Sequence, residues 1–204
     1  MIITNPAEIR IILGEKTLND LDNLPEHLGG HMNKVHTDRG PLKLMMKEYN
    51  CKSLLDIGCG PGWQVDVAKD LGYQSYGIDG DWTVLPKKPN FWLHDFTEGP
   101  VEHEANERYD LAWSVEFLEH IEEQYLPNVM ESFRLCKYAI VTHAVPGQNG
   151  HHHVNLQEKQ YWVDKFGKYD MLINEELTTK VREASLMHKP FIKRTGLVFV
   201  NEKY

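Results

Sequence analysis

The sequence lacks the features that define membrane, secreted and repetitive proteins. No apolar run in its 204 residues approaches the roughly 18–20 residues that a membrane span needs. Asn5, Pro6, Glu8 and Arg10 interrupt the apolar residues at the start, which argues against a secretory signal peptide. Neither an internal repeat nor a low-complexity linker is present. We therefore expect one soluble domain, with no membrane association.

Cysteine and positive charge are also scarce. The sequence has an odd number of cysteines, Cys51, Cys59 and Cys136, and no C-x-x-C pair. This disfavours a disulfide framework or a four-cysteine zinc site, and it suits a protein of the reducing cytoplasm. Basic residues are outnumbered by acidic ones, 22 against 30, and the formal net charge is −8. This charge disfavours a broad surface for phosphate groups, so we do not expect nucleic-acid binding. Histidine, in contrast, is abundant, with 11 residues.

Strand and helix patterns alternate through the middle of the chain. The predicted strands are 53–57, 75–78, 91–93, 110–114 and 138–142, and the predicted helices are 41–49, 64–71, 158–166 and an amphipathic stretch from 117 to about 135. Two later strands are predicted at 171–177 and 196–201, at the edge of the sheet, where they can run antiparallel. This alternation predicts an α/β protein with a doubly wound, mostly parallel sheet.

The segment 54–62, LLDIGCGPG, is the most informative part of the sequence. A buried strand runs into a loop with Gly58, Gly60 and Gly62, and glycine lets a ligand lie against the backbone. The loop leads into a helix at the carboxyl ends of the strands, where open parallel sheets bind ligands. The spacing is neither the dinucleotide fingerprint nor a phosphate loop, which favours a nucleoside ligand without a pyrophosphate.

Acidic residues end the next two predicted strands. Asp79 follows the strand 75–78 and is placed to accept hydrogen bonds from both hydroxyls of a ribose. Asp95 follows the strand 91–93 and is placed to accept a hydrogen bond from the exocyclic amine of an adenine. Together with the glycine loop, these two carboxylates predict an adenosine-binding site.

The segments LLDIGCGPG, GID, HDF and YDLAWSVEFLEHI, in this order, resemble the class I S-adenosylmethionine (SAM)-dependent methyltransferases over roughly residues 50–145. The resemblance implies a seven-stranded sheet and transfer of the SAM methyl group to a nucleophile, with S-adenosylhomocysteine as the product. We expect a methyltransferase domain over residues 41–204, after an N-terminal extension over residues 1–40. The implied SAM site comprises Asp56, Gly58, Cys59, Gly60, Pro61, Gly62, Asp79, Gly80, Trp82, Asp95, Phe96 and Ser114.

The segment after the fourth predicted strand carries Glu116, Glu119 and His120. If a helix begins near residue 116, these three side chains share one face. Two carboxylates and an imidazole are costly to bury together unless they are paired or bound to a cation. The donor set suits Mg²⁺ or Mn²⁺, and the imidazole also allows Zn²⁺, Fe²⁺ or Co²⁺.

The loop 143–155 contains three consecutive histidines and is the expected source of a fourth ligand. E-x-x-E-H followed by a later histidine resembles small-RNA 2′-O-methyltransferases and ubiquinone-pathway O-methyltransferases, which hold a divalent ion on such a quartet. By register with the following helix, His152 matches the last ligand best, and His153 is the nearby alternative. Metal-free methyltransferases carry a similar stretch, in which Glu116 would contact SAM and His120 would act as the general base.

Four histidines are candidates for contact with the acceptor: His31, His36, His143 and His153. The first two lie in the N-terminal extension, which we expect to form a lid over the acceptor or else a plain surface loop. We expect a small-molecule acceptor with an oxygen nucleophile, aligned in line with the methyl group and the sulfur. The alternatives are an RNA 3′ end, which the negative charge disfavours, a nucleoside-binding domain without activity, and a lyase or dehydrogenase. The sequence does not specify the oligomeric state.

Overall fold

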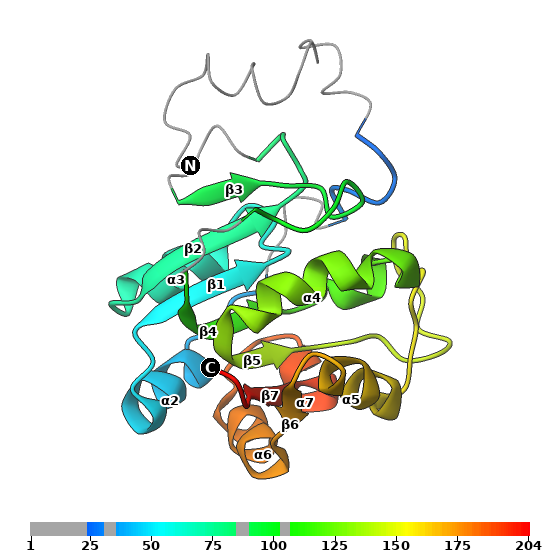
Figure 1. Ribbon diagram of the computed structural model, residues 1–204. Coiled ribbons are helices and arrows are strands. Elements are labelled where there is room, and N and C mark those ends of the chain that lie inside the picture. Colours follow the sequence, from blue (N-terminus) through cyan, green and yellow to red (C-terminus); the bar gives the residue numbers. More distant parts are fainter. Residues whose placement is uncertain (1–23, 31–35, 85–89, 103–106) are drawn as a thin grey trace.

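The computed structural model describes residues 24–30, 36–84, 90–102 and 107–204 (Figure 1). Within them lies one seven-stranded sheet in the order β3-β2-β1-β4-β5-β7-β6, which confirms the predicted fold class. The strands are β1 Ser53–Ile57, β2 Gln74–Asp79, β3 Phe91–Leu93, β4 Tyr109–Ser114, β5 Cys136–Val141, β6 Met171–Ile173 and β7 Leu197–Asn201. The α-helices are α2 Gly40–Tyr49, α3 Trp63–Asp70, α4 Leu126–Arg134, α5 Lys159–Gly167, α6 Glu175–Ala184 and α7 Phe191–Thr195.

The sheet is parallel except at one edge. β1 to β5 pair in parallel, whereas β7 runs antiparallel to both β5 and β6. The chain starts at β1 in the middle, builds outward to β3, and then crosses to β4 and builds the other half. The carboxyl ends of the parallel strands therefore meet at one edge, and β1 and β4 are neighbours at the crossover.

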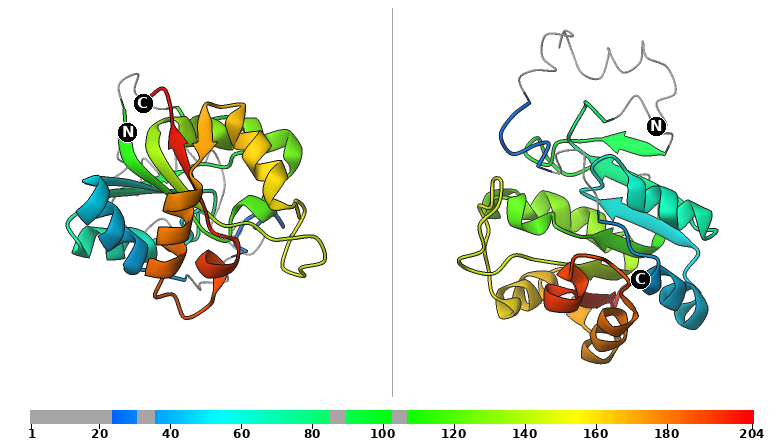
Figure 2. Two further views of the ribbon diagram at one scale, coloured as in Figure 1. Left: turned by 90° about the horizontal axis from the view of Figure 1, so that it is seen from below. Right: turned by 180° about the vertical axis from the view of Figure 1, so that it is seen from behind.

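Helices cover both faces of the sheet (Figure 2). α4 and α5 pack on one face, and α2, α3, α6 and α7 pack on the other. Because successive strand residues point to opposite faces, Trp113 of β4 joins the second core while its neighbour Ala112 joins the first. Strands buried on both faces read as continuous apolar runs, which is why the central strands were predictable.

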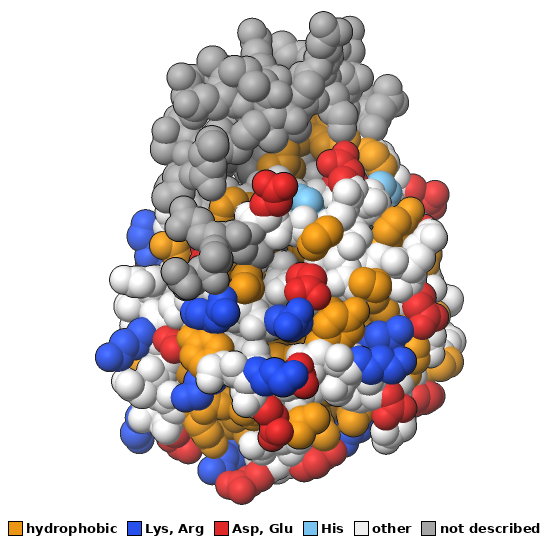
Figure 3. Space-filling view, viewed as in Figure 1, with side chains coloured by type: hydrophobic (Ala, Val, Ile, Leu, Met, Phe, Trp, Pro, Cys, Tyr) orange, Lys and Arg blue, Asp and Glu red, His pale blue; other side chains and the backbone are white. Residues whose placement is uncertain are grey.

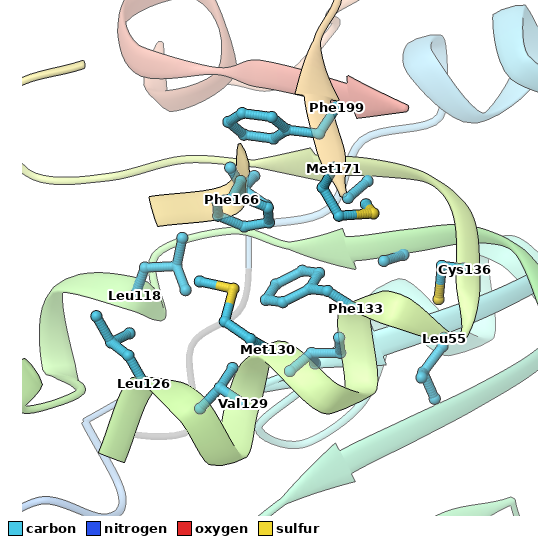
Figure 4. Close-up of a cluster of buried hydrophobic side chains, with 14 of the residues drawn as sticks. Leu55, Leu118, Leu126, Val129, Met130, Phe133, Cys136, Phe166, Met171 and Phe199 are labelled. Atoms are coloured by element: carbon cyan, nitrogen blue, oxygen red, sulfur yellow. The ribbon is translucent and has the colours of Figure 1, made fainter. Parts of the chain in front are cut away.

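Three phenylalanine rings lie among leucine, valine, methionine and cysteine side chains in the first of these cores (Figure 4). Phe166 of α5 stacks on Phe199 of β7 with ring centroids 4.1 Å apart, and Phe133 of α4 meets Phe166 edge-on at 5.0 Å. These rings join helices to the antiparallel edge of the sheet. Of the described helices, none is both long and apolar enough to cross a membrane.

The helix expected from residue 117 was wrong at its start. Two short 3₁₀ turns, Leu118–His120 and Glu123–Tyr125, precede α4. Glu116 has a left-handed backbone, with φ of 57°, and Ile121 is extended, so no helix passes through either residue. Glu116 therefore does not share a helix face with Glu119.

The late strand predicted over 171–177 was wrong beyond residue 173. β6 ends at Ile173, and α6 begins two residues later. The Asn174 side chain accepts a hydrogen bond from Leu177 N at 2.9 Å, and Glu175 and Glu176 lie in the first turn. An amide cap followed by two acidic residues stabilises a helix N-terminus and overrides the apolar run before it.

Candidate functional site

A cavity of about 320 Å³ opens at the carboxyl ends of β1, β2, β3 and β4. Several predicted residues line it: Asp56, Gly58, Cys59, Gly60, Asp79, Gly80, Asp95, Phe96, Glu116, His120, His36, His152 and His153. Pro61, Gly62, Trp82, Ser114, Glu119 and His143 are not among its lining residues. His31 lies outside the described residues. The cavity thus brings the glycine loop together with the histidine-rich segments.

The glycine loop continues the sheet beyond β1. The backbone N–H groups of Gly58 and Cys59 both donate to the carbonyl of Ile78, at 2.9 and 3.0 Å. Gly58 has φ of 75°, and a Cβ there would lie 2.0 Å from the Phe117 ring. A side chain at this position would be strained and would displace that ring, so glycine is required here.

Two carboxylates lie beneath and beside this loop. Asp79 at the end of β2 accepts hydrogen bonds from Gly60 N at 2.6 Å and from Asp81 N at 2.9 Å. Asp56 is 3% exposed, and burial, together with the charge of Asp79, raises its pKa well above the usual range. A cationic or hydrogen-bond-donating ligand would stabilise the ionised form of this pair.

Asp95 is held at both carboxylate oxygens. Its Oδ1 accepts from the backbone N and the hydroxyl of Thr97, at 2.9 and 2.8 Å, and its Oδ2 lies 2.9 Å from His27 Nε2. Burial alone would raise the pKa of Asp95, but hydrogen bonds from His27 and Thr97 outweigh it and lower that pKa. The buried ring of Phe96 adds an apolar wall next to Phe117, with centroids 6.0 Å apart.

Ser114, which was expected in this site, lies at the junction of β4 and β1. Its side chain is fully buried, and its hydroxyl donates to the carbonyl of Ile57 at 2.9 Å, which ties β4 to β1. Gly62 forms the N-cap of α3, where its φ of 74° turns the chain into the helix. Neither residue is among those that line the cavity.

Glu119, His120 and His153 form a compact cluster of donor atoms. One ligand atom from each lies within 4.8 Å of the others, in a search limited to the described residues. The backbone N–H groups of Val154 and Asn155 both donate to the Glu119 carbonyl at 3.0 Å, and Asn155 Nδ2 donates to the Ile121 carbonyl at 3.1 Å. These bonds fasten the histidine loop to the 3₁₀ turn and bring His153, the alternative to His152, to the cluster.

Burial dominates the electrostatics of this cluster. Both Glu119 carboxylate oxygens and His120 Nδ1 are buried without a hydrogen-bond partner among the residues described. Burial and the neighbouring Glu116 raise the pKa of Glu119 to about 8. Burial raises the pKa of Glu116 to about 7, against a hydrogen bond from Thr142. Burial and the neighbouring His153 lower the pKa of His120 to about 4.

Glu116 and His152 stand beside the cluster rather than in it. The hydroxyl of Thr142, the residue after β5, accepts a hydrogen bond from Glu116 N at 2.8 Å and donates one to Glu116 Oε1 at 3.2 Å. These bonds hold the left-handed Glu116, which follows β4, against the end of β5. His152 is also left-handed, with φ of 45°, and its buried Nε2 has no partner in the described part of the chain. Because the backbone turns at His152, the His153 side chain joins the cluster and the His152 side chain lies beside it.

The remaining histidines expected to contact an acceptor differ in position. His36 lines the cavity and packs against Phe191 with ring centroids 4.9 Å apart. Burial, with Lys189 and His188 nearby, lowers its pKa. His143 is only 4% exposed and lies against Trp162, with centroids 6.3 Å apart. His143 is not among the residues that line the cavity.

Several cavity residues were not predicted: His27, Leu28, Gly29, Gly30, Gln64, His94, Thr97, Trp113, Val115, Phe117, Ile121, Glu122, Tyr125 and His151. Thr97 had a local signal, because an Asp followed two residues later by a Thr favours a turn closed by the carboxylate. His27 had none, since its partner Asp95 is 68 residues away in sequence.

The sequence matches a family described as "methyltransferase domain" over residues 30–186. No curated protein matches the chain significantly. Among solved structures, a TehB-like SAM-dependent methyltransferase from Corynebacterium glutamicum shares 15% identity, covers 97% of this chain and 100% of its own, and has a TM-score of 0.56.

Two further structures share the fold. A Burkholderia thailandensis 1,6-didemethyltoxoflavin-N1-methyltransferase with bound 1,6-didemethyltoxoflavin and S-adenosylhomocysteine is 10% identical, covers 98% of this chain and 91% of its own, and has a TM-score of 0.54. The methyltransferase domain of bacterial CtHen1-C is 20% identical, with 79% and 96% coverage and a TM-score of 0.54. At these sequence identities the similarity shows a shared fold only.

Proposed function

Because this chain belongs to the family of class I SAM-dependent methyltransferase domains, we propose that it methylates an oxygen atom of a small-molecule acceptor. One observation carries the proposal. A single cavity runs from the glycine loop and the carboxylates at the ends of β1, β2 and β3 to His120 and His153. It therefore offers a nucleoside site and a proton-accepting or cation-binding site side by side.

The residues of the first region suit SAM. Asp79 would hold the ribose hydroxyls, and Asp95 with Phe96 would hold the adenine. Asp56 would face the methionine end, where a cationic amino group would offset the burial that raises its pKa. When bound, SAM supplies an electrophilic methyl group on a sulfonium sulfur, and its transfer leaves S-adenosylhomocysteine.

The second region suits a divalent cation. Glu119 presents two buried oxygens that find no hydrogen-bond partner among the described residues, an arrangement that is costly unless a proton or a cation compensates it. Glu119, His120 and His153 would hold the ion, and one carboxylate with two imidazoles suits Zn²⁺ or Mn²⁺ better than Mg²⁺. A bound divalent ion lowers the pKa of a hydroxyl that it contacts. Without an ion, His120 would be the candidate base, but burial lowers its pKa to about 4, which makes it a weak proton acceptor at neutral pH.

A small acceptor is favoured by size and charge. The cavity lies at the lower end of the range typical of small-molecule sites. On the face shown in Figure 3, the basic side chains of described residues alternate with acidic and hydrophobic ones, which does not suit a long phosphate backbone. An RNA 3′ end is the second candidate, because Glu116, Glu119, His120 and a later loop histidine resemble in sequence the ligand quartet of small-RNA 2′-O-methyltransferases.

The test is formation of S-adenosylhomocysteine from SAM with a panel of hydroxylated small molecules and a short RNA, before and after treatment with EDTA. We expect turnover with a small hydroxylated acceptor, loss of turnover on chelation, and recovery with Mn²⁺ or Zn²⁺. Turnover that survives chelation would contradict the role of the cation and favour His120 alone. Turnover with RNA only would contradict the small acceptor, and failure to bind SAM would contradict the whole proposal.

A further inference from the structure

Residues 24–30, called the strap below, form an outer wall of the cavity. His27, Leu28, Gly29 and Gly30 all line it, although they precede the sheet in sequence. A turn begins the strap, with Leu28 N donating to the Pro25 carbonyl at 2.9 Å. The strap therefore adds residues from before the sheet to a site whose other walls are strand ends, loops and the start of α3.

One part of the strap covers the nucleoside end of the cavity. His27 Nε2 lies 2.9 Å from Asp95 Oδ2, and the two side chains are 29% and 20% exposed. Leu28 lies over the end of β2, where a Cβ on Gly80 would come within 2.6 Å of Leu28 Cδ2. Because Gly80 has no side chain, Leu28 of the strap can pack directly against the backbone next to Asp79.

The strap also reaches the histidine cluster. The Glu26 carbonyl lies 3.0 Å from His151 Nε2, and a Cβ built on Gly30 would lie 3.5 Å from the His120 ring. The rings of His27 and His152 are 6.4 Å apart. These contacts fix the strap at a second place, so the position of His27 is set independently of its bond to Asp95.

We propose that His27 is a positioning residue of the cofactor site, which orients Asp95 to recognise the exocyclic amine of the nucleobase. This inference rests on the proposed function, in which Asp95 faces the adenine of SAM. Thr97 restrains only Oδ1, and His27 restrains Oδ2. A carboxylate oxygen accepts two hydrogen bonds, so Oδ2 keeps one acceptor site for an amine. Holding that site in place before binding lowers the ordering cost of recognition.

The experiment compares S-adenosylhomocysteine with S-inosylhomocysteine, in which an oxygen replaces the exocyclic amine. Calorimetric affinities are measured for the parent protein, His27→Ala, His27→Gln and His188→Ala, whose histidine is exposed and lies outside the cavity. We expect the parent and His188→Ala to prefer the adenine ligand by about tenfold or more, as for a site built around a buried hydrogen bond. His27→Ala should reduce this ratio about fivefold by weakening adenine binding alone, and His27→Gln, which keeps a donor, should restore part of it.

The ratio separates positioning from a merely structural role. If His27→Ala weakens both ligands equally, or leaves the ratio unchanged, the inference is overturned. It is also overturned if the parent binds both ligands equally, although the cofactor proposal then stands. If the parent binds neither ligand, the proposed function itself fails. Circular dichroism checks the fold of each variant, and if His27→Ala is unfolded, a parent-like ratio in His27→Phe, which lacks a donor, overturns the inference.

Discussion

At the scale of single residues, the buried carboxylate of Glu119 is expected to lower the free energy of unfolding, which indicates a functional rather than a structural role. Its oxygens have no partner in the described structure, whereas its backbone carbonyl accepts two hydrogen bonds from the loop. Glu119→Met removes the unpaired oxygens and leaves the carbonyl in place. We expect the metal-free protein to gain about 1–2 kcal/mol, because an unsatisfied buried polar group costs about that much. In a domain of this size the melting temperature should rise by about 2–4 °C for each kcal/mol.

The measurement is thermal unfolding in EDTA, together with titration of Mn²⁺ or Zn²⁺. Glu183→Met is the control, because Glu183 is exposed on α6 and away from the cavity. The control should change neither the melting temperature nor the cation affinity. Glu119→Met should raise the melting temperature and lose cation binding. A lower melting temperature for Glu119→Met would mean that its carboxylate already stabilises the fold without an ion.

At the scale of elements, the loop after β5 is held to the 3₁₀ turn by Asn155. Asn155 follows His153 by two residues. Its side chain is buried and donates a hydrogen bond to the Ile121 carbonyl at 3.1 Å. Asn155→Ala should therefore loosen His153 and weaken cation binding about tenfold, as loss of a group that orients a ligand commonly does. Binding of S-adenosylhomocysteine should change less than about twofold, because Asn155 does not line the cavity.

Competition with a chromophoric chelator measures the cation affinity. Asn201→Ala is a matched control, because that side chain also donates to backbone carbonyls, those of Arg134 and Cys136, but at the remote end of β7. The control should lose stability and keep its cation affinity. Equal losses of cation affinity in the two variants would contradict a specific role for Asn155.

At the scale of the whole molecule, local sequence patterns predicted the sheet and the glycine loop. Contacts between segments far apart in the sequence determine which histidines join the site. The apolar runs of β1, β2 and β4 and the glycine loop are properties of short segments, so the sheet and one edge of the cavity were predictable. The choice of His153 over His152 depends on a backbone turn at residue 152 and on bonds to Glu119. His27 meets Asp95 only through the path of the strap, which no local pattern encodes. The division of the chain after residue 40 stays a prediction.

Asp38 joins three distant parts of the molecule. Its buried carboxylate accepts from Gly40 N, from the Ser185 hydroxyl, and from the backbone N–H groups of residues 186 and 187, at 2.5–3.2 Å. Its backbone N and carbonyl pair with the side chain of Gln64, which lines the cavity. The segment before α2, the first turn of α3 and the loop before α7 are thus tied to one residue.

Asp38→Ala should therefore destabilise the whole domain rather than one loop. We expect a loss of about 3–5 kcal/mol in the free energy of unfolding, because the donors around Asp38 would stay buried without an acceptor. Asp70→Ala is the matched control, since its ion pair with Arg39 is exposed and should be worth less than about 1 kcal/mol. Urea unfolding monitored by circular dichroism and by tryptophan fluorescence measures both variants. Because Asp38 ties together segments that pack on one face of a single seven-stranded sheet, the two signals should shift together, and a shift confined to one signal would show that the three segments unfold separately.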